Sequence, residues 1–517
     1  MRDLRRRNFV AGMGAAAALA ASPPASTMAA TPSTDFAYRT ATDLLQALTA
    51  RQVSARELVD AAIARIEALD PRINAVVVRD FDRARAAALA ADAALARGER
   101  RALLGLPMTV KEQFNVAGLP TTWGIEKFRN WRPEADALVV RRLKAAGAII
   151  LGKTNVPVAL ADWQSDNPVY GTTNNPWDVT RSPGGSSGGA AAALAAGFVP
   201  LELGSDLGGS LRCPAHFCGV LCHKSSLDLI PQRGSGYPAT PPLPVRGDMS
   251  VIGPMARSAA DLALELRAVA GPDELTDGIG YRLALPPPRH DTLAAFRVLV
   301  IDRHPLCPTA ESVRSALDGL ADRLATLGCG VTRSHSNMPD LARTTRNYVE
   351  LLAAFFTADL SPEERVRTEA EAASLSPDNQ SLSAAYLRGV TMTHAAWLRT
   401  SGNRDGLRAR WQALFRDVDV ILCPPMPTPA FPHDHTPHET RELDIDAKKV
   451  PYDDQVVWCA IATLCGLPAT VAPIGHSERG LPIGVQIIGG YLDDQTTIAF
   501  AGLIERAFGG FAPPPDL

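Results

Sequence analysis

Three serines lie on glycine-rich stretches in the middle of the chain. Ser186 and Ser187 stand between two glycine pairs in S-P-G-G-S-S-G-G-A-A-A, and Ser210 ends the run G-S-D-L-G-G-S. Glycine lets other groups approach the backbone closely, so such loops expose main-chain N–H groups. A serine hydroxyl beside such donors can attack a carbonyl carbon if a base removes its proton. The nature of that base decides the chemistry.

A histidine base is one hypothesis. Residues 184–188 satisfy the G-x-S-x-G pattern, but that elbow must directly follow a strand, and here a turn-rich loop precedes it. The nearest histidines, His216 and His223, lie among cysteines and apolar residues, where structural histidines are commoner. The S-x-x-K pattern of penicillin-recognising enzymes does not occur in the sequence. A Ser-His-Asp enzyme is therefore the weaker interpretation.

Lys111 follows an apolar stretch, L-P-M-T-V, that reads as a short strand over residues 106–110. A lysine amine in water titrates near pH ~10.4 and cannot act as a base at neutral pH. Burial disfavours the charged form, and lowering the pKa to ~7.5 requires about 4 kcal/mol of differential solvation. Glu112 would oppose this shift only from the same face, and successive strand residues point to opposite faces. The alternative is a surface lysine paired with Glu112.

A phosphate-binding loop is a further hypothesis, because residues 147–154 read G-A-I-I-L-G-K-T. A phosphate cradle needs a flexible loop between its glycines and a helix directly after it. Here the intervening residues have the composition of a strand, and the following N-V-P does not continue a helix. The pattern therefore predicts a buried strand.

The stretches around Lys111 and the serines resemble the amidase signature family. The resemblance covers residues 40–265 and 455–507, and includes G-L-P-M-T-V-K-E, G-S-D-L-G-G-S-L-R-C-P-A and G-L-P-I-G-V-Q-I-I-G. T-N-V-P and N-P-V-Y-G are also similar to the fatty-acid amide hydrolase branch. The resemblance implies a triad in which Lys111 is the base, Ser186 a bridging residue with a cis peptide bond, and Ser210 the nucleophile. No metal or organic cofactor would be required.

The resemblance also implies supporting groups around this triad. The backbone N–H groups expected to form an oxyanion hole are those of Leu207, Gly208, Gly209 and Ser210. The residues expected to orient the triad are Ser187, Asp206 and Arg212. Those expected to line the substrate pocket are Leu160, Trp123 and Trp163, although both tryptophans also suit core packing. Ser205 stands where the family more often has threonine, and residues 223–226, H-K-S-S, depart from the usual G-x-K-P-T run.

Strand-like and helix-like segments alternate along the chain. Apolar strand patterns occur at residues 148–151, 298–301, 418–422, 469–474 and 483–488, and helical patterns at 82–98, 136–146 and 496–507. A capping box, Ser54 with Glu57, begins another helix, which Asp70-Pro71 should stop. The alternation predicts the α/β class: a single large domain with a central twisted mixed β-sheet covered by helices on both faces. Residues 271–289 and 424–452 read as loops, and 340–400 as a polar helical stretch.

The first thirty residues have the composition of an export signal. A basic start with Arg6-Arg7 precedes a short Ala/Gly-rich apolar run and small residues, which fits the twin-arginine type. The run is too short to span a bilayer core of about 30 Å. We therefore expect cleavage near residues 29–30, a periplasmic location and an amidase domain over 31–517, with 340–454 near the substrate entrance. The alternative is a basic terminus on a cytoplasmic enzyme.

The composition describes a globular protein with a large core: 517 residues, 46% hydrophobic and 21% charged, with a net charge of −3. This near-neutral charge gives no electrostatic basis for binding nucleic acid or an anionic membrane. We expect a small-molecule amide substrate, no nucleic acid, no stable membrane insertion, and a monomer or homodimer. Cys213, Cys218 and Cys222 with His223 fit no zinc template, and the histidines at 433, 435 and 438 suit a solvated loop.

These observations favour a serine hydrolase that cleaves a carboxylic amide to an acid and ammonia or an amine. One alternative is a glutamine-hydrolysing subunit of an amidotransferase, which would work in the cytoplasm with a partner. Others are an esterase or carbamate hydrolase on the same scaffold, and a non-catalytic binding protein. The export signal argues against the partnered subunit, and the intact Lys111, Ser186 and Ser210 argue against the binding protein.

Overall fold

A mixed β-sheet of eleven strands runs through the part of the chain that the computed structural model describes, residues 36–244, 246–357, 360–515 and 517. Its order is β1-β3-β2-β4-β6-β5-β12-β13-β9-β7-β8. Strand β2 pairs in parallel with β3 and β4, β7 pairs in parallel with β8 and β9, and the other pairs are antiparallel. The strands are β1 (Val76–Arg79), β2 (Pro107–Lys111), β3 (Ile149–Thr154), β4 (Leu201–Asp206), β5 (Leu221–Lys224), β6 (Val251–Ala256), β7 (Arg297–Val300), β8 (Gly330–Thr332), β9 (Val420–Cys423), β12 (Ala469–His476) and β13 (Pro482–Ile488).

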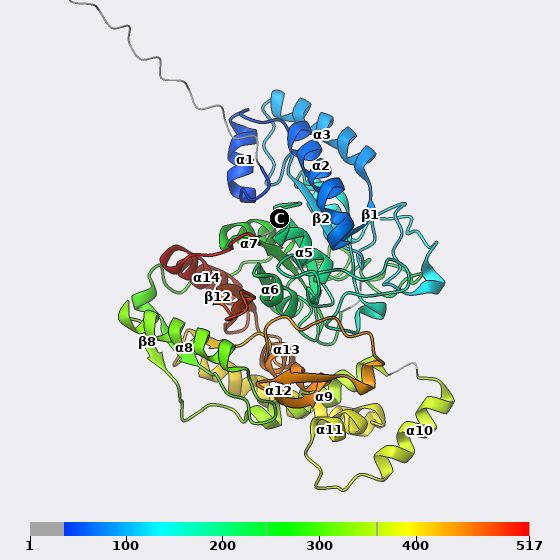
Figure 1. Ribbon diagram of the computed structural model, residues 1–517, viewed down its shortest axis with the longest axis vertical. Helices are drawn as coiled ribbons and strands as arrows, with labels where there is room; N and C mark the ends of the chain where they lie inside the picture. The colour runs from blue at the N-terminus through cyan, green and yellow to red at the C-terminus, as the bar shows by residue number, and fades with distance from the viewer. Residues whose placement is uncertain (1–35, 245, 358–359, 516) are drawn as a thin grey trace, which may run out of the picture. The chain divides into compact units, whose positions relative to one another are not determined.

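Helices cover the sheet, as the α/β prediction required, and the predicted fold class is confirmed (Figure 1). In sequence order they are α1 (Ala41–Thr49), α2 (Ala55–Ile73), α3 (Phe81–Ala96), α4 (Leu138–Ala145), α5 (Gly188–Ala195), α6 (Arg212–Cys218), α7 (Ala259–Val269), α8 (Glu311–Thr326), α9 (Leu341–Phe356), α10 (Pro362–Ala373), α11 (Leu382–Val390), α12 (His394–Leu414), α13 (Ala460–Leu464) and α14 (Asp494–Phe508). The polar stretch predicted over residues 340–400 holds α9, α10, α11 and the start of α12. Helices α11 and α12 both pack against α9.

Helix α5 is buried along its whole length, and its sequence explains why. It reads G-G-A-A-A-A-L-A, and these small residues let it pack against α6 and the strands β2, β3, β4 and β6. A side chain at Gly189 would place its Cβ 2.3 Å from the backbone nitrogen of Asn155, so only glycine fits there. The N-terminus of α5, which carries Ser186 and Ser187 just before it, is thereby held against the end of the sheet.

Residues 36–517 form one compact unit. The predicted export signal, residues 1–30, lies outside the residues that the structure describes. Within the described residues, no helix has both the length and the apolar character that crossing a membrane requires. All eight cysteines are free and buried.

Two local predictions are wrong. The capping box of Ser54 and Glu57 is present, but α2 continues through Pro71 to Ile73. It ends at Asn74 in the left-handed conformation, while Asp70 accepts hydrogen bonds from the backbone just beyond the helix.

The loop predicted over residues 424–452 contains a β-hairpin of β10 (Glu442–Ile445) and β11 (Lys448–Pro451). Its alternation of exposed and buried residues was obscured by the surrounding prolines and histidines.

Candidate active site

Lys111 is the last residue of β2 and is fully buried. The strand lies between β3 and β4, and helix α5 packs against it, so no part of the side chain is exposed to solvent. Lys111 Nζ lies 2.7 Å from Ser186 Oγ and 2.9 Å from Ser205 Oγ. Burial lowers the pKa of Lys111 to about 7, although the carboxyl groups of Asp206 and Glu202 act in the opposite direction. A fraction of this amine is therefore uncharged near neutral pH.

Glu112 lies in the turn just after β2, and its carboxylate is bonded away from this amine, as expected, although not through strand alternation. Its carboxylate accepts hydrogen bonds from the backbone N–H groups of Thr122 and Trp123, at 2.6 and 2.9 Å. The Tyr170 hydroxyl donates to the same carboxylate at 3.0 Å. Glu112 thus supports the loop that follows β2 and forms no hydrogen bond to Lys111.

Ser186 precedes α5 and follows a cis peptide bond between Gly185 and Ser186. Its side chain is buried against the Lys111 amine. The next residue, Ser187, donates its backbone N–H to the carbonyl oxygen of Ser210 at 3.1 Å. The structure therefore brings Lys111 and both glycine–serine stretches together, although 75 residues separate Lys111 from Ser186.

Residues 207–210 lie in the loop that joins β4 to α6, and the three carbonyl groups of this segment before Ser210, like that of Ser210 itself, accept hydrogen bonds. The Leu207 carbonyl accepts from Tyr348 Oη at 2.8 Å, and the Gly208 carbonyl accepts from Trp163 Nε1 at 2.8 Å. The Gly209 carbonyl accepts from the Cys213 N–H at 2.7 Å, in the first turn of α6. In a trans peptide the carbonyl and the following N–H point in opposite directions. These bonds therefore fix the directions of the next three N–H groups.

One of the four N–H groups expected in the oxyanion hole is already engaged. The Gly209 N–H donates to Asp206 Oδ1 at 3.1 Å. Gly209 has a φ of +92°, and a Cβ there would lie 2.5 Å from Cys459 Sγ, so glycine is required at this position.

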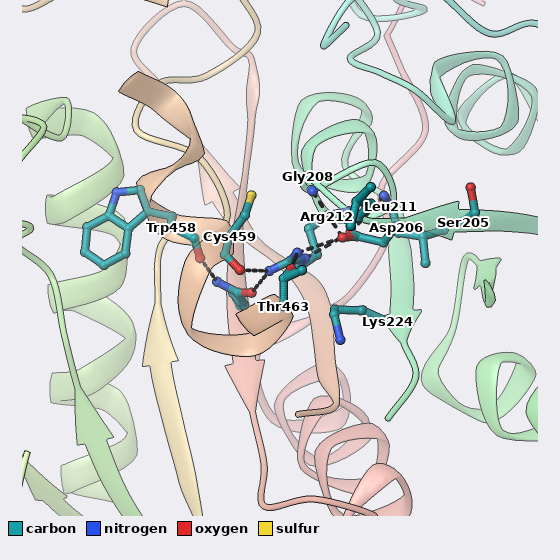
Figure 2. A network of polar contacts seen from close by, with 12 residues as sticks. Ser205, Asp206, Gly208, Leu211, Arg212, Lys224, Trp458, Cys459 and Thr463 are labelled. Carbon is teal, nitrogen blue, oxygen red and sulfur yellow. Dashed lines mark hydrogen bonds and ion pairs between the residues drawn. The ribbon is translucent and has the colours of Figure 1, made fainter. Parts of the chain in front are cut away.

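Arg212 opens α6 and pairs with Asp206, the last residue of β4, and both side chains are fully buried. The guanidinium donates to the two carboxylate oxygens at 3.0 and 2.7 Å (Figure 2). Burial alone would raise the pKa of Asp206, but the charge of Arg212 lowers it to about 2. Further donors of the guanidinium reach oxygen atoms of Cys459, Thr463 and Gln486. This network anchors both ends of the 207–210 loop to α13 and β13.

Of the three residues expected to line a substrate pocket, Trp163 lies at the loop. Its indole contacts the Gly208 carbonyl and packs edge-on against Tyr452, with ring centroids 5.6 Å apart. Trp123 is placed differently: its Nε1 donates to the Gln113 carbonyl at 3.3 Å, and its ring packs against Tyr237. Leu160 ends the short 3-10 turn Val158–Leu160, which is joined to the Trp123 carbonyl through the Ala159 N–H.

His216 and His223, the two histidines considered as bases, are not bonded to the serines of the site. His216 Nδ1 accepts from the Gly484 N–H at 2.8 Å and Nε2 faces the Thr428 carbonyl at 3.1 Å, which makes it a neutral, fully bonded ring. Burial lowers the pKa of His216 to about 4. His223 lies between Thr470 and Asp494. Neither ring is bonded to Ser186 or Ser210.

The other two patterns are structural. Lys153, the lysine of the phosphate-loop pattern at residues 147–154, lies in β3 and is buried. Its amine donates to Thr121 Oγ1 at 2.7 Å and to the Pro120 carbonyl. In the described part of the chain, no three His, Cys, Asp or Glu side chains gather into a group that could hold a metal ion. His438 is instead bonded to Asp453 at 2.8 Å.

Sequence reasoning missed several groups of this site. Gln113 accepts a hydrogen bond from Ser205 at 2.5 Å, and Tyr348 reaches the loop from α9, 141 residues from its partner Leu207. Gln113 lies in the turn that follows β2, where the Phe114 N–H donates to the Lys111 carbonyl at 3.0 Å, so strand alternation does not predict the direction of its side chain. Tyr348 lies in a polar helical stretch without a motif, and nothing local marks it.

A family model described as Amidase matches residues 57–498 of the chain. The chain belongs to the amidase family. The match includes the residues between 265 and 455, where the motifs alone were uninformative. The resemblance to the amidase signature family is confirmed, and the chain is an enzyme of the amidase class.

Similar proteins agree with membership of the amidase family. A glutamyl-tRNA(Gln) amidotransferase subunit of Anaeromyxobacter sp. (strain K) is 34% identical over 488 residues, covering 90% of this chain and 96% of that protein. Indoleacetamide hydrolase of Bradyrhizobium diazoefficiens is 34% identical over 481 residues, covering 90% of this chain and 86% of that protein. The solved structure of the corresponding amidotransferase subunit from Thermotoga maritima has a TM-score of 0.72 and 26% identity, covering 93% of this chain and 98% of that one.

Proposed function

We propose that the protein hydrolyses a linear carboxylic amide, outside a peptide backbone or at a C-terminal amide, with Ser210 as nucleophile. The observation that carries this proposal is the buried Lys111 amine, held 2.7 Å from Ser186 with its pKa lowered to about 7. A base of this kind needs no histidine, and its uncharged form is available at neutral pH. The 207–210 loop supplies fixed backbone donors for the developing oxyanion.

The reaction proceeds by two transfers through the same groups. Uncharged Lys111 takes the proton of Ser186 while Ser186 takes that of Ser210, whose oxygen bonds to the amide carbonyl carbon. The proton then passes back through Ser186 to the departing nitrogen, the C–N bond breaks, and an acyl-enzyme remains on Ser210. Water, deprotonated by the same relay, attacks this ester, the bond between the acyl carbon and Ser210 Oγ breaks, and the proton returns through Ser186 to Ser210 as the acid leaves. No step in this sequence calls on a cofactor.

A glutamine-hydrolysing subunit is the second candidate, because a protein at 34% identity is named as part of a glutamyl-tRNA(Gln) amidotransferase. Against it stands the basic leader with Arg6-Arg7, which supports export through the twin-arginine route and a periplasmic monomer or homodimer. The half-buried side chains of Trp163 and Leu207 favour an amide with an apolar acyl group. Ester or carbamate substrates would use the same acyl-enzyme.

The test is a panel of glutamine, aryl and alkyl amides, amidated peptides, esters and carbamates, assayed for acid release with purified mature protein. Ser210→Ala should abolish turnover and also abolish labelling by a fluorophosphonate probe. Ser383→Ala, which removes an exposed hydroxyl on α11, is the matched control and should change neither. Retained activity in Ser210→Ala would overturn the assigned nucleophile. Glutamine hydrolysis that appears only with a co-purified second protein would favour the amidotransferase role.

A further inference from the structure

The Lys111 amine contacts two hydroxyl groups, and only one of them belongs to the proposed relay. Ser186 Oγ lies at 2.7 Å and Ser205 Oγ at 2.9 Å. Both side chains are buried, so no bulk water separates the amine from either. The enzyme therefore needs some feature that makes Lys111 the base for Ser186 and prevents it from accepting the proton of Ser205.

Gln113 supplies a fixed acceptor behind Ser205. Its Nε2 donates to the Ser235 carbonyl at 3.0 Å, and a carbonyl oxygen can only accept. The amide is therefore oriented with Oε1 toward Ser205, whose Oγ lies 2.5 Å away. Both Gln113 and Ser235 are buried, with 7% and 3% of their surface exposed, so solvent does not compete for these bonds.

The hydrogen-bond inventory then leaves one arrangement. Because Gln113 Oε1 can only accept, the single proton of Ser205 is committed to it. Ser205 Oγ can consequently only accept from Lys111, which uses one N–H of the amine. An uncharged amine has two N–H groups and one lone pair, and the lone pair is kept away from Ser205 by the lone pairs of that oxygen.

We propose that Gln113 and Ser205 are positioning residues that turn the lone pair of uncharged Lys111 away from Ser205 and make it available to Ser186. The proposal rests on the proposed Ser210 hydrolase function. It assigns to Ser205 a role that depends on its hydroxyl group alone. Ser205 stands at the position where the family more often has threonine. The proposal also assigns a role to the second residue after the catalytic lysine.

The first test compares Ser205→Ala with Ser205→Thr. The alanine variant should lose about tenfold or more in kcat with KM changed less than twofold, because a hydrogen bond to a group that becomes charged is lost. Threonine keeps the hydroxyl and should restore kcat to within threefold of wild type. A kcat in Ser205→Thr as low as in Ser205→Ala, with both proteins folded, would overturn the proposal, since bulk and not the hydroxyl would then matter.

The second test uses pH and a Gln113 variant. Loss of Ser205 as an acceptor disfavours the charged amine, so Ser205→Ala should move the acid limb of the kcat/KM profile to lower pH. Gln113→Met keeps Ser205 but removes the acceptor of its proton, so kcat should fall about tenfold or more while the acid limb stays near its wild-type position. The other titratable groups that act on Lys111, Asp206 and Glu202, are unchanged in both variants. Wild-type kcat in folded Gln113→Met would overturn the proposal.

These outcomes are distinct from a failure of the proposed function. If Ser210→Ala stays active, the nucleophile is misassigned whatever Gln113 does. If Ser210→Ala is inactive and the Gln113 and Ser205 variants keep wild-type kcat, only the positioning role fails. The rate of fluorophosphonate labelling at Ser210 gives a second readout, which should fall in Ser205→Ala and Gln113→Met and recover in Ser205→Thr.

Discussion

The rate of amide hydrolysis should follow the uncharged fraction of Lys111. Burial lowers the pKa of this amine from 10.5 to about 7, a change that corresponds to about 5 kcal/mol at 1.36 kcal/mol per unit. Only the uncharged amine can accept the proton, so kcat/KM should rise with pH around a midpoint of about 7 and then level off. From about pH 8 to about pH 6 the uncharged fraction falls from roughly nine-tenths to one-tenth, which predicts a loss of about tenfold.

The assay is initial-rate hydrolysis of a neutral amide in overlapping buffers of constant ionic strength, between about pH 5.5 and pH 9.5, where the substrate itself does not titrate. Lys153 provides the matched control because it is equally buried on the neighbouring strand β3, and burial lowers its pKa to about 8. Lys153→Met should leave the midpoint unchanged, and Lys111→Met should be inactive at every pH. A rate that is flat across this pH range would refute the reasoning, and so would a midpoint that shifts in Lys153→Met.

Two further predictions concern stability. Lys111→Met should raise the free energy of unfolding near pH 7 by about 2 kcal/mol, because the wild-type amine is costly to bury and its hydroxyl partners offset part of that cost. Since the unfolded lysine binds more protons between the two pKa values, wild-type stability should rise by about 4 kcal/mol between about pH 7 and pH ~10.4, so the difference should change sign in this range and the wild type should be the more stable protein near pH ~10.4. Urea unfolding at both pH values checks this, and an unchanged difference would contradict it. Arg212→Leu should cost about 3–5 kcal/mol by leaving Asp206 buried without its partner, and an unaltered unfolding midpoint would show that the pair is not needed.

The glycines beside Ser186 and Ser210 stand where the backbone is closely packed. At Gly188 an added Cβ would lie 2.4 Å from Ser165 Oγ, and at Gly209 it would lie 2.5 Å from Cys459 Sγ. Local reasoning located β2 before Lys111. Periodicity likewise predicted the α/β class, since buried strands and amphipathic helices leave distinct patterns in the chain.

Local reasoning failed where distant segments provide the contact. Tyr348 and Trp163 hold successive carbonyl groups of the 207–210 loop, yet they come from different parts of the chain. The helix predicted to stop at Asp70-Pro71 continues to Ile73, because a proline near a helix end costs little when the following backbone is bonded by Asp70. Tyr348 and Trp163 are 141 and 45 residues from their partners, whereas Asp70 is only 5 residues from Ala75, so the helix end was a failure of local reasoning itself.

Residue types and their spacing predicted the α/β scaffold and the amidase class, and they singled out one lysine and two serines as candidates for amide hydrolysis. They did not establish that the lysine can act as a base. The lowered pKa of Lys111 arises because its amine is buried between Ser186, just before α5, and Ser205 of β4, while Gln113 holds Ser205 in place. The proton affinity of a side chain depends on the dielectric and the dipoles around it, and these come from strands and loops that meet only when the sheet is assembled.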